Sequence, residues 1–111
     1  MVISSPVIKP KLSIIIVSWN CLGYLKKCLN SILSSSISFP LEIIIVDNAS
    51  SDGTVEVIKS AYPQIKLIAN QSNLGFPRAC NQGLKASAGS FLLLLNPDTE
   101  LHPETLEKSV N

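Results

Sequence analysis

The chain has 111 residues, of which 46% are hydrophobic and 15% are charged. This balance is too apolar for a disordered segment, and the length allows one domain with a buried core but not two. Nine basic residues stand against eight acidic ones, and no basic cluster exceeds Lys26-Lys27, which argues against a surface for nucleic acids.

The first ten residues contain two prolines and predict an extended lead-in, so that residues 11–111 form the domain. They lack the basic start and apolar stretch of a secretory signal, and the longest apolar run, Phe91 to Leu95, is far shorter than the roughly 20 residues that span a bilayer. Three cysteines without a Cys-x-x-Cys pair predict reduced thiols, two of them facing the core. We therefore expect no transmembrane segment and a cytoplasmic location, free or peripheral at the inner face of the membrane.

Four short apolar runs are the predicted strands. They are residues 12–17, 41–46, 65–69 and 91–95. Each run is apolar at consecutive rather than alternating positions, which is typical of strands buried on both faces of a parallel sheet.

Helical spacing of apolar residues fills the intervals between these strands. It predicts helices over residues 22–33, 55–62 and 76–84, and a last helix that opens at Pro103 and ends near Val110. We expect Asp52 or Thr54 to cap the second helix, Pro77 to lie in the first turn of the third, and Gly89 to adopt the left-handed conformation after it. The alternation predicts an α/β fold: a three-layer, doubly wound, mainly parallel sheet with four parallel strands and intervening helices.

Function is expected at the carboxyl ends of the strands, where doubly wound sheets bind ligands. Polar segments follow every predicted strand, but none contains a dinucleotide Gly-x-Gly-x-x-Gly loop, a P-loop or a nucleophile elbow. The single histidine, His102, is expected to be a surface or capping residue. A bound diphosphate would then need a cation held by a carboxylate.

Asp98 is the candidate for that carboxylate, because it follows the most apolar strand on a turn made rigid by Pro97. The alternative is an aspartate that only turns the chain into the last helix. Asp47 ends the second strand and could accept a hydrogen bond from the imide N–H of uracil or thymine, or else close an Asx turn there.

The segment after the third strand combines Asn73, Gly75, Arg78 and Asn81. Arg78 is the only cation that we expect near the strand ends. It could bind a diphosphate or the edge of a base, or be an ordinary exposed arginine in the first turn of a helix.

Taken together, four motifs resemble family-2 glycosyltransferases. They are Ser13-Ile14-Ile15-Ile16-Val17-Ser18-Trp19-Asn20, Ile45-Val46-Asp47-Asn48-Ala49-Ser50-Ser51-Asp52-Gly53-Thr54, Asn73-Leu74-Gly75-Phe76 with Asn81-Gln82-Gly83, and Leu95-Asn96-Pro97-Asp98-Thr99. The resemblance spans residues 11–110. It implies a GT-A fold and the inverting transfer of a sugar from a nucleoside diphosphate donor. It also implies nucleotide contacts from Asn20 and Asp47, and makes Asp98 the last acid of a metal-binding Asp-x-Asp element. The donor-binding candidates are therefore Trp19, Asn20, Asp47, Asn73, Gly75, Arg78, Asn81 and Asn96, with Asp98 at the metal.

The form of the motifs is most similar to the bacterial rhamnosyltransferase-like branch, which favours a thymidine diphosphate sugar, with uridine diphosphate next. The cofactor implied is Mg²⁺ or Mn²⁺, although Asn96 stands where the metal motif often begins with an acid. The sequence stops about one helix after Asp98, so we expect a domain that is incomplete at its C-terminus, with no catalytic base of its own. Its acceptor, a carbohydrate or a lipid-linked sugar, is not indicated, and its exposed apolar edge predicts self-association or a partner.

Two other classes compete with this prediction. One is a non-catalytic module that binds nucleotide sugars or a protein partner through the same fold. The other is a flavodoxin-like signalling receiver, which needs an acidic pair after the first strand, where this chain has Ser18-Trp19-Asn20.

Overall fold

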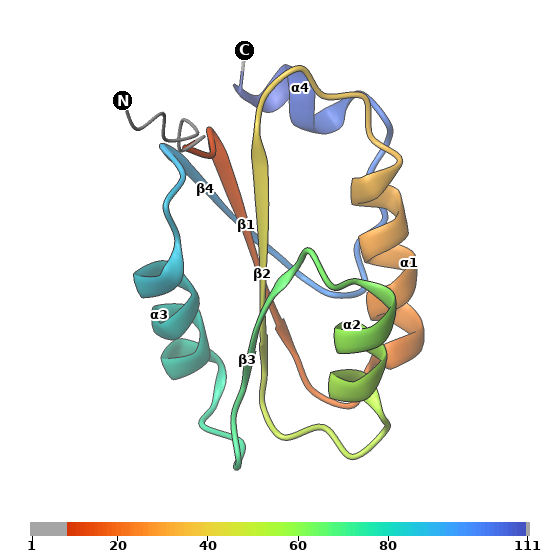
Figure 1. Ribbon diagram of the computed structural model, residues 1–111, viewed down its shortest axis with the longest axis vertical. Coiled ribbons are helices and arrows are strands. Elements are labelled where there is room, and N and C mark those ends of the chain that lie inside the picture. Colours follow the sequence, from red (N-terminus) through yellow and green to blue (C-terminus); the bar gives the residue numbers. More distant parts are fainter. Residues whose placement is uncertain (1–8, 111) are drawn as a thin grey trace, which may run out of the picture.

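The computed structural model describes residues 9–110, so residues 1–8 of the predicted lead-in, and Asn111, lie outside the described residues. Within this part of the chain, four strands alternate with four helices (Figure 1). In chain order they are β1 (Leu12–Ser18), α1 (Leu22–Leu33), β2 (Leu41–Asp47), α2 (Thr54–Ala61), β3 (Lys66–Ala69), α3 (Phe76–Ala86), β4 (Phe91–Leu95) and α4 (Thr105–Val110). No helix in residues 9–110 has both the length and the apolar character needed to cross a bilayer.

The four strands form one parallel sheet in the order β3-β2-β1-β4. β1 and β2 pair over their full lengths, from Leu12 with Leu41 to Ser18 with Asp47. The chain adds strands on one side of β1 and then returns to place β4 on the other side, so the strand order reverses between β1 and β4. The predicted doubly wound parallel sheet is confirmed.

Helices cover both faces of the sheet: α1 and α2 lie on one face and α3 on the other (Figure 1). Successive residues of β1 and β2 point to opposite faces, so Ile14, Ile16, Ile43 and Ile45 join the core under α1 and α2. Ile15, Ile44 and Val46 pack with Ala79 of α3. These strand residues are buried from both sides, which explains their continuous apolar runs.

Two glycines permit close packing against β1. A Cβ on Gly83 of α3 would lie 2.5 Å from Cγ2 of Ile15, so only glycine lets this helix approach the sheet so closely. The predicted left-handed conformation of Gly89 is wrong, because only Gly53 and Gly75 among the described glycines have positive φ. Gly89 instead passes over the start of β1, where a Cβ would lie 2.6 Å from the hydroxyl of Ser13.

The outer strands differ from the expectation of burial on both faces. β3 and β4 are edge strands, and neither contains a fully buried residue. In β4, Phe91, Leu92 and Leu94 are each about 50% exposed. Each of these strands has a hydrogen-bonded neighbour on one side only, and helices cover it incompletely. Its apolar side chains are therefore partly exposed at an open edge of the sheet. The sequence could not predict this, because an apolar run looks the same in an edge strand and in a central strand.

Candidate functional site

Polar residues gather at the carboxyl ends of the strands, a surface that we call the rim. It consists of residues 18–20, 47–53, 70–75 and 96–100, and the ends of β1, β2 and β3 face the lower edge of Figure 1. Because the strand order reverses between β1 and β4, the crevice expected in a doubly wound sheet lies between residues 18–20 and residues 96–100.

Asp47 lies beneath the rim, where its side chain is fully buried. Oδ1 accepts hydrogen bonds from the hydroxyls of Ser18 at 2.7 Å and Ser50 at 2.6 Å, and Oδ2 accepts one from the Ser50 N–H at 2.8 Å. This geometry is that of the alternative considered above, an aspartate that closes the turn after its strand. The contact of Asp47 with a base stays a prediction.

Trp19 and Asn20 stand above this turn at the end of β1, and both are exposed. Asn20 has a positive φ of 47°, and its Oδ1 accepts a 2.7 Å hydrogen bond from the Ser51 N–H, while its own N–H donates to the Ser50 hydroxyl at 2.9 Å. The loops after β1 and β2 are thereby tied together. The Trp19 side chain is 56% exposed, which leaves its ring free to pack against a ligand.

Asp52 joins the starts of two helices. Its Oδ2 accepts from the Leu22 N–H of α1 at 3.0 Å, and its Oδ1 accepts from the Thr54 N–H of α2 at 3.2 Å. The hydrogen bonds from Thr54 lower the pKa of this carboxyl, with a further contribution from the Leu22 N–H. The predicted capping of α2 by Asp52 or Thr54 is wrong as stated, because Gly53 is the N-cap residue, although Asp52 accepts a hydrogen bond from the first N–H of the helix. The bond of Asp52 to α1 had no signal in the sequence.

The segment after β3 brings Asn73 and Gly75 together at the start of α3. Asn73 Oδ1 accepts a 2.9 Å hydrogen bond from the Gly75 N–H, and Gly75 has φ of +86°, a conformation that disfavours any side chain. Pro77 lies in the first turn of α3 as predicted. Arg78 and Asn81 are exposed on the same helix, so both are available to a ligand.

Asn96 and Asp98 follow β4 and are exposed. They line a hollow of about 460 Å³ together with Cys21, Tyr24 and Pro97. An adjoining hollow of about 430 Å³ is lined by Asn20–Tyr24, Lys27 and Asp52. Cys21 and Tyr24 belong to both hollows, so the two hollows, which together we call the depression, adjoin at the first turn of α1.

Sequence reasoning missed two contributors to this depression. Tyr24 is 63% exposed and lines both hollows. Lys27 lines the second hollow, so the expectation that Arg78 is the only cation near the strand ends is wrong. The exposed face of the predicted helix over residues 22–33 could have signalled both, because its first turn must begin at the rim.

A model of the family described as Glycosyl transferase family 2 matches residues 13–111. The chain belongs to this family. Glycosyltransferase AglE of Haloferax volcanii is 32% identical over 106 residues, which cover 92% of this chain and 35% of that protein. Chondroitin synthase of Pasteurella multocida is 31% identical over 101 residues, which cover 88% of this chain and 10% of that protein. The family 2 chain thus spans about a third or less of the length of these relatives.

Solved structures agree with this assignment. S. aureus TarS 1-349 matches with a TM-score of 0.78 and 28% identity, over 89% of this chain and 31% of that one, and the same protein has been solved with UDP and with UDP-GlcNAc. A mannosyltransferase from Pyrobaculum calidifontis matches with a TM-score of 0.80 at 23% identity, over 92% of this chain and 32% of that one, which shows a common fold. The predicted GT-A fold is confirmed.

The residues at the rim fit a divalent cation that is shared with a ligand rather than caged by the protein. Among the described residues, no three histidine, cysteine, aspartate or glutamate side chains are placed to surround a metal. Asp98 offers one exposed carboxylate. Mg²⁺ is commonly bound by one or two carboxylates together with substrate phosphates and water, so Asp98 and a diphosphate would complete such a site.

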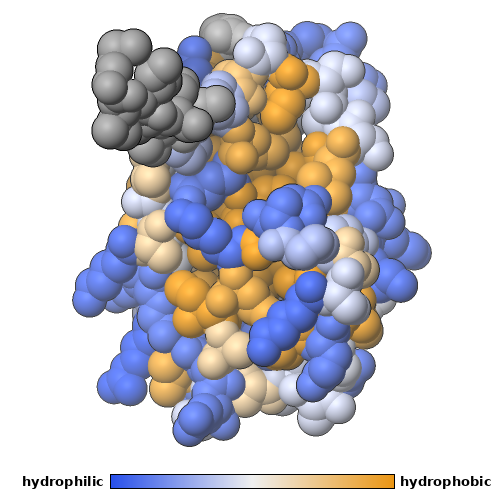
Figure 2. All heavy atoms as spheres, viewed as in Figure 1, coloured by the Kyte–Doolittle hydropathy of each residue, from blue (hydrophilic) through white to orange (hydrophobic). Residues whose placement is uncertain are grey.

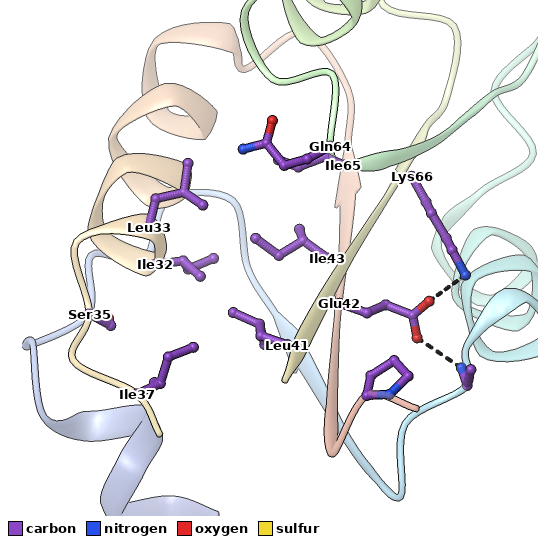
Figure 3. Close-up of a pocket in the computed structure, with 12 residues that line it drawn as sticks. Ile32, Leu33, Ser35, Ile37, Leu41, Glu42, Ile43, Gln64, Ile65 and Lys66 are labelled. Carbon is purple, nitrogen blue, oxygen red and sulfur yellow. Dashed lines mark hydrogen bonds and ion pairs between the residues drawn. The ribbon is translucent and has the colours of Figure 1, made fainter. Parts of the chain in front are cut away.

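A larger hollow lies at the opposite end of the sheet and contains none of the predicted site residues. Its volume is about 610 Å³, and its walls come mainly from the end of α1 and the starts of β2 and β3 (Figure 3). Figure 2 shows apolar side chains exposed along the middle of this face of the molecule. β3 begins opposite Ile44, so residues 41–43 of β2 have no neighbour on that side, which leaves the gap.

Two charged residues, Glu42 and Lys66, border this hollow. The Glu42 carboxylate accepts hydrogen bonds from the Ser13 hydroxyl at 2.5 Å and the Ala88 N–H at 2.8 Å, and it pairs with Lys66 (Figure 3). Burial raises the pKa of Glu42, but the hydrogen bonds from Lys66, Ser13 and Ala88 outweigh it, so the pKa lies below the usual value. All its partners are structural, and we assign Glu42 to the sheet rather than to the site.

The cysteines match the prediction of free thiols, with Cys28 and Cys80 buried. Burial raises the pKa of Cys28 to about 11, and the nearby charge of Asp98 adds to this effect. Burial likewise raises the pKa of Cys21. Neither thiol is therefore activated as a nucleophile.

Proposed function

We propose that this family 2 chain is the donor-binding part of an inverting glycosyltransferase that transfers a sugar from a nucleoside diphosphate. The observation that supports this most is the depression at the strand-order reversal, where Asn20 and Asp98 line adjoining hollows that share Tyr24. Asp98 lines one of these hollows, and the exposed Trp19 directly precedes Asn20, which lines the other.

For the donor we propose a uridine or thymidine diphosphate sugar. The likeness to TarS, solved with UDP and UDP-GlcNAc, favours uridine, whereas the Asn-Pro-Asp-Thr form of the last motif favours the rhamnosyltransferase-like branch and thymidine. Both bases present the same imide N–H and a flat ring. An exposed tryptophan ring can stack on either, since stacking tolerates differences between bases.

Asp98 is the residue that we expect to hold the divalent cation, Mg²⁺ or Mn²⁺, with the donor diphosphate. A cation in that place would stabilise the negative charge of the departing diphosphate. Among cations of the chain itself, Lys27 lines the depression and Arg78 lies on α3, and either could contact phosphate oxygens.

Inverting transfer also needs a base that deprotonates the acceptor hydroxyl. Asp47 and Asp52 are engaged in hydrogen bonds that support the loops, so neither carboxylate is offered as that base. We therefore expect this chain by itself to bind the donor and to transfer no sugar. Its acceptor, carbohydrate or lipid-linked, and its cytoplasmic location remain predictions.

We also propose that the open edge of β4 mediates self-association. Between Lys85 and Asp98 the sequence contains no charged residue, so the edge lacks the charges that commonly protect such strands. A second copy could pair its own β4 with this one and cover the apolar side chains of Phe91, Leu92 and Leu94.

A non-catalytic module that binds nucleotide sugars is the second candidate. The engagement of Asp47 and Asp52 in hydrogen bonds that support the loops favours it, because neither carboxylate is then offered as a base. Sugar transfer catalysed by this chain with any acceptor would exclude this candidate.

The test is a calorimetric titration of the purified chain with UDP and with TDP, each with and without Mg²⁺ or Mn²⁺, repeated on Asp98→Ala. Binding that requires the metal and disappears in Asp98→Ala would support the donor site. If the folded wild-type chain binds neither nucleotide, the proposal is wrong for this chain.

A further inference from the structure

Three amide side chains beneath the rim form one hydrogen-bonded chain across three elements. Asn48 follows β2 and is 3% exposed, Asn70 follows β3, and Gln82 lies on α3. Their contacts are more complete than a surface group of amides would show, and the donor-binding proposal makes no use of them.

Asn70 and Gln82 are paired in both directions. Asn70 Nδ2 donates to Gln82 Oε1 at 2.8 Å, and Gln82 Nε2 donates to Asn70 Oδ1 at 2.9 Å. The backbone N–H of Asn70 also donates to the Asp47 carbonyl at 2.9 Å. The end of β3 is thus joined to the middle of α3 and to the end of β2.

Asn48 continues the chain to the loop before α3. Its Oδ1 accepts from Asn70 Nδ2 at 3.1 Å and from the Leu74 N–H at 3.4 Å, and its Nδ2 donates to the Gly75 carbonyl at 3.3 Å. Asn48 is buried and Asn70 and Gln82 are half-buried, and each of the three side chains has at least two hydrogen bonds. A network of this kind, partly shielded from water, favours one arrangement of the groups it joins.

From this connection we infer that Asn48, Asn70 and Gln82 are positioning residues: they set the loop of residues 71–75 relative to the turn after β2, so that both sides of the nucleotide site keep one geometry. The inference rests on the proposed donor site. The loop contains Asn73 and Gly75, and Arg78 lies in the first turn of the helix that follows it, whereas the turn after β2 supports Asn20 through Ser50 and Ser51.

The test uses the substitution Asn70→Asp, which keeps the shape of the side chain and removes its Nδ2–H donor. At pH 8 the carboxylate would face the oxygens of Asn48 and Gln82, while protonation at low pH restores one O–H donor. We expect amide hydrogen exchange of Leu74 and Gly75 to rise roughly tenfold at pH 8, after correction for intrinsic rates, with β1 still protected. We expect UDP or TDP affinity to fall by a similar factor, and both effects to shrink relative to wild type once the pH is low enough to protonate the new carboxylate.

Two further variants complete the design. Gln82→Glu removes the other donor of the pair and should act like Asn70→Asp if the pair is the cause. Asn30→Asp adds the same charge on α1 and keeps the acceptor for the Tyr62 hydroxyl, so it should leave the loop and the affinity unchanged.

The inference is overturned if amide hydrogen exchange of the loop is unchanged at pH 8 in folded Asn70→Asp and Gln82→Glu. It is also overturned if exchange of the loop rises while nucleotide affinity does not fall. The third contrary result is an Asn30→Asp variant that raises exchange and lowers affinity as the other two variants do. Failure of the proposed function is recognised separately, because the wild-type chain would then bind no nucleotide. In that case the exchange data still decide whether the three amides position the loop.

Discussion

The hydroxyl of Ser18 donates a 2.7 Å hydrogen bond to Oδ1 of Asp47, its register partner in the last pair of β1 and β2. The bond joins the two central strands where their polar loops begin. Asp47 therefore stabilises the turn and the sheet when no ligand is bound.

Asp47→Ala should lower the free energy of unfolding. The substitution leaves the Ser18 hydroxyl and the Ser50 N–H without their partner, which costs about 2–4 kcal/mol for buried groups bonded to a carboxylate. Urea denaturation of the variant and of Asp47→Asn, which keeps one acceptor oxygen, would measure this. Loss of nucleotide affinity with unchanged stability would instead mean that Asp47 contacts the base directly.

Asp98→Ala should show the opposite pattern. Asp98 is exposed, so removing its carboxylate should change stability by less than about 0.5 kcal/mol. The metal-dependent part of nucleotide affinity should fall about tenfold or more, because the cation loses its carboxylate. Glu100→Ala, an exposed carboxylate in the same segment, is the control in calorimetry; an equal loss there would refute the assignment of the metal to Asp98.

Stability should depend on pH through Glu42. Its pKa in the folded chain lies below the usual 4.5, so its contribution is present above that pH and is lost as the pH falls through the folded value. Glu42→Gln should therefore be less stable than wild type at pH 7, and the two should converge below about pH 4.5. Urea midpoints between pH 7 and pH 3 test this; a constant difference would show that the charge of Glu42 contributes nothing.

Two glycine substitutions should have opposite effects. Gly83→Ala places a Cβ 2.5 Å from Ile15 Cγ2, and overpacking of this kind costs about 1–3 kcal/mol. Gly23→Ala adds a Cβ with nothing within 4 Å on an exposed helical turn, and should stabilise the chain by up to about 1 kcal/mol. Thermal or urea unfolding compares them, and a stabilising Gly83→Ala would mean that α3 does not pack closely on β1.

A charge on the edge strand should prevent self-association. Leu92→Lys places an ammonium group on β4, where the native side chain is 50% exposed, so the domain should fold while pairing of two edges becomes unfavourable. Sedimentation velocity across a concentration series should show wild type associating and Leu92→Lys monomeric. Leu33→Lys makes the same change at a 46% exposed leucine of α1 and should associate like wild type. A monomeric wild type would remove the proposed role of β4.

The sequence by itself determined the order and type of the elements, because a strand buried on both faces must be apolar throughout and a helix must repeat its apolar residues at its own period. It also placed the candidate residues at strand ends and, through four motifs, indicated the family that the comparison confirmed.

Three other features emerged only from the tertiary structure. Edge and central strands read alike in sequence, so the exposure of β4 depended on strand order. Asp47 was identified as buried only once Ser18 and Ser50 were placed around it. The hydrogen-bonded amides of Asn48, Asn70 and Gln82 join residues that lie up to 34 positions apart in the sequence (82 − 48). A local sequence pattern cannot predict such contacts, because they form only when separate strands and helices pack together.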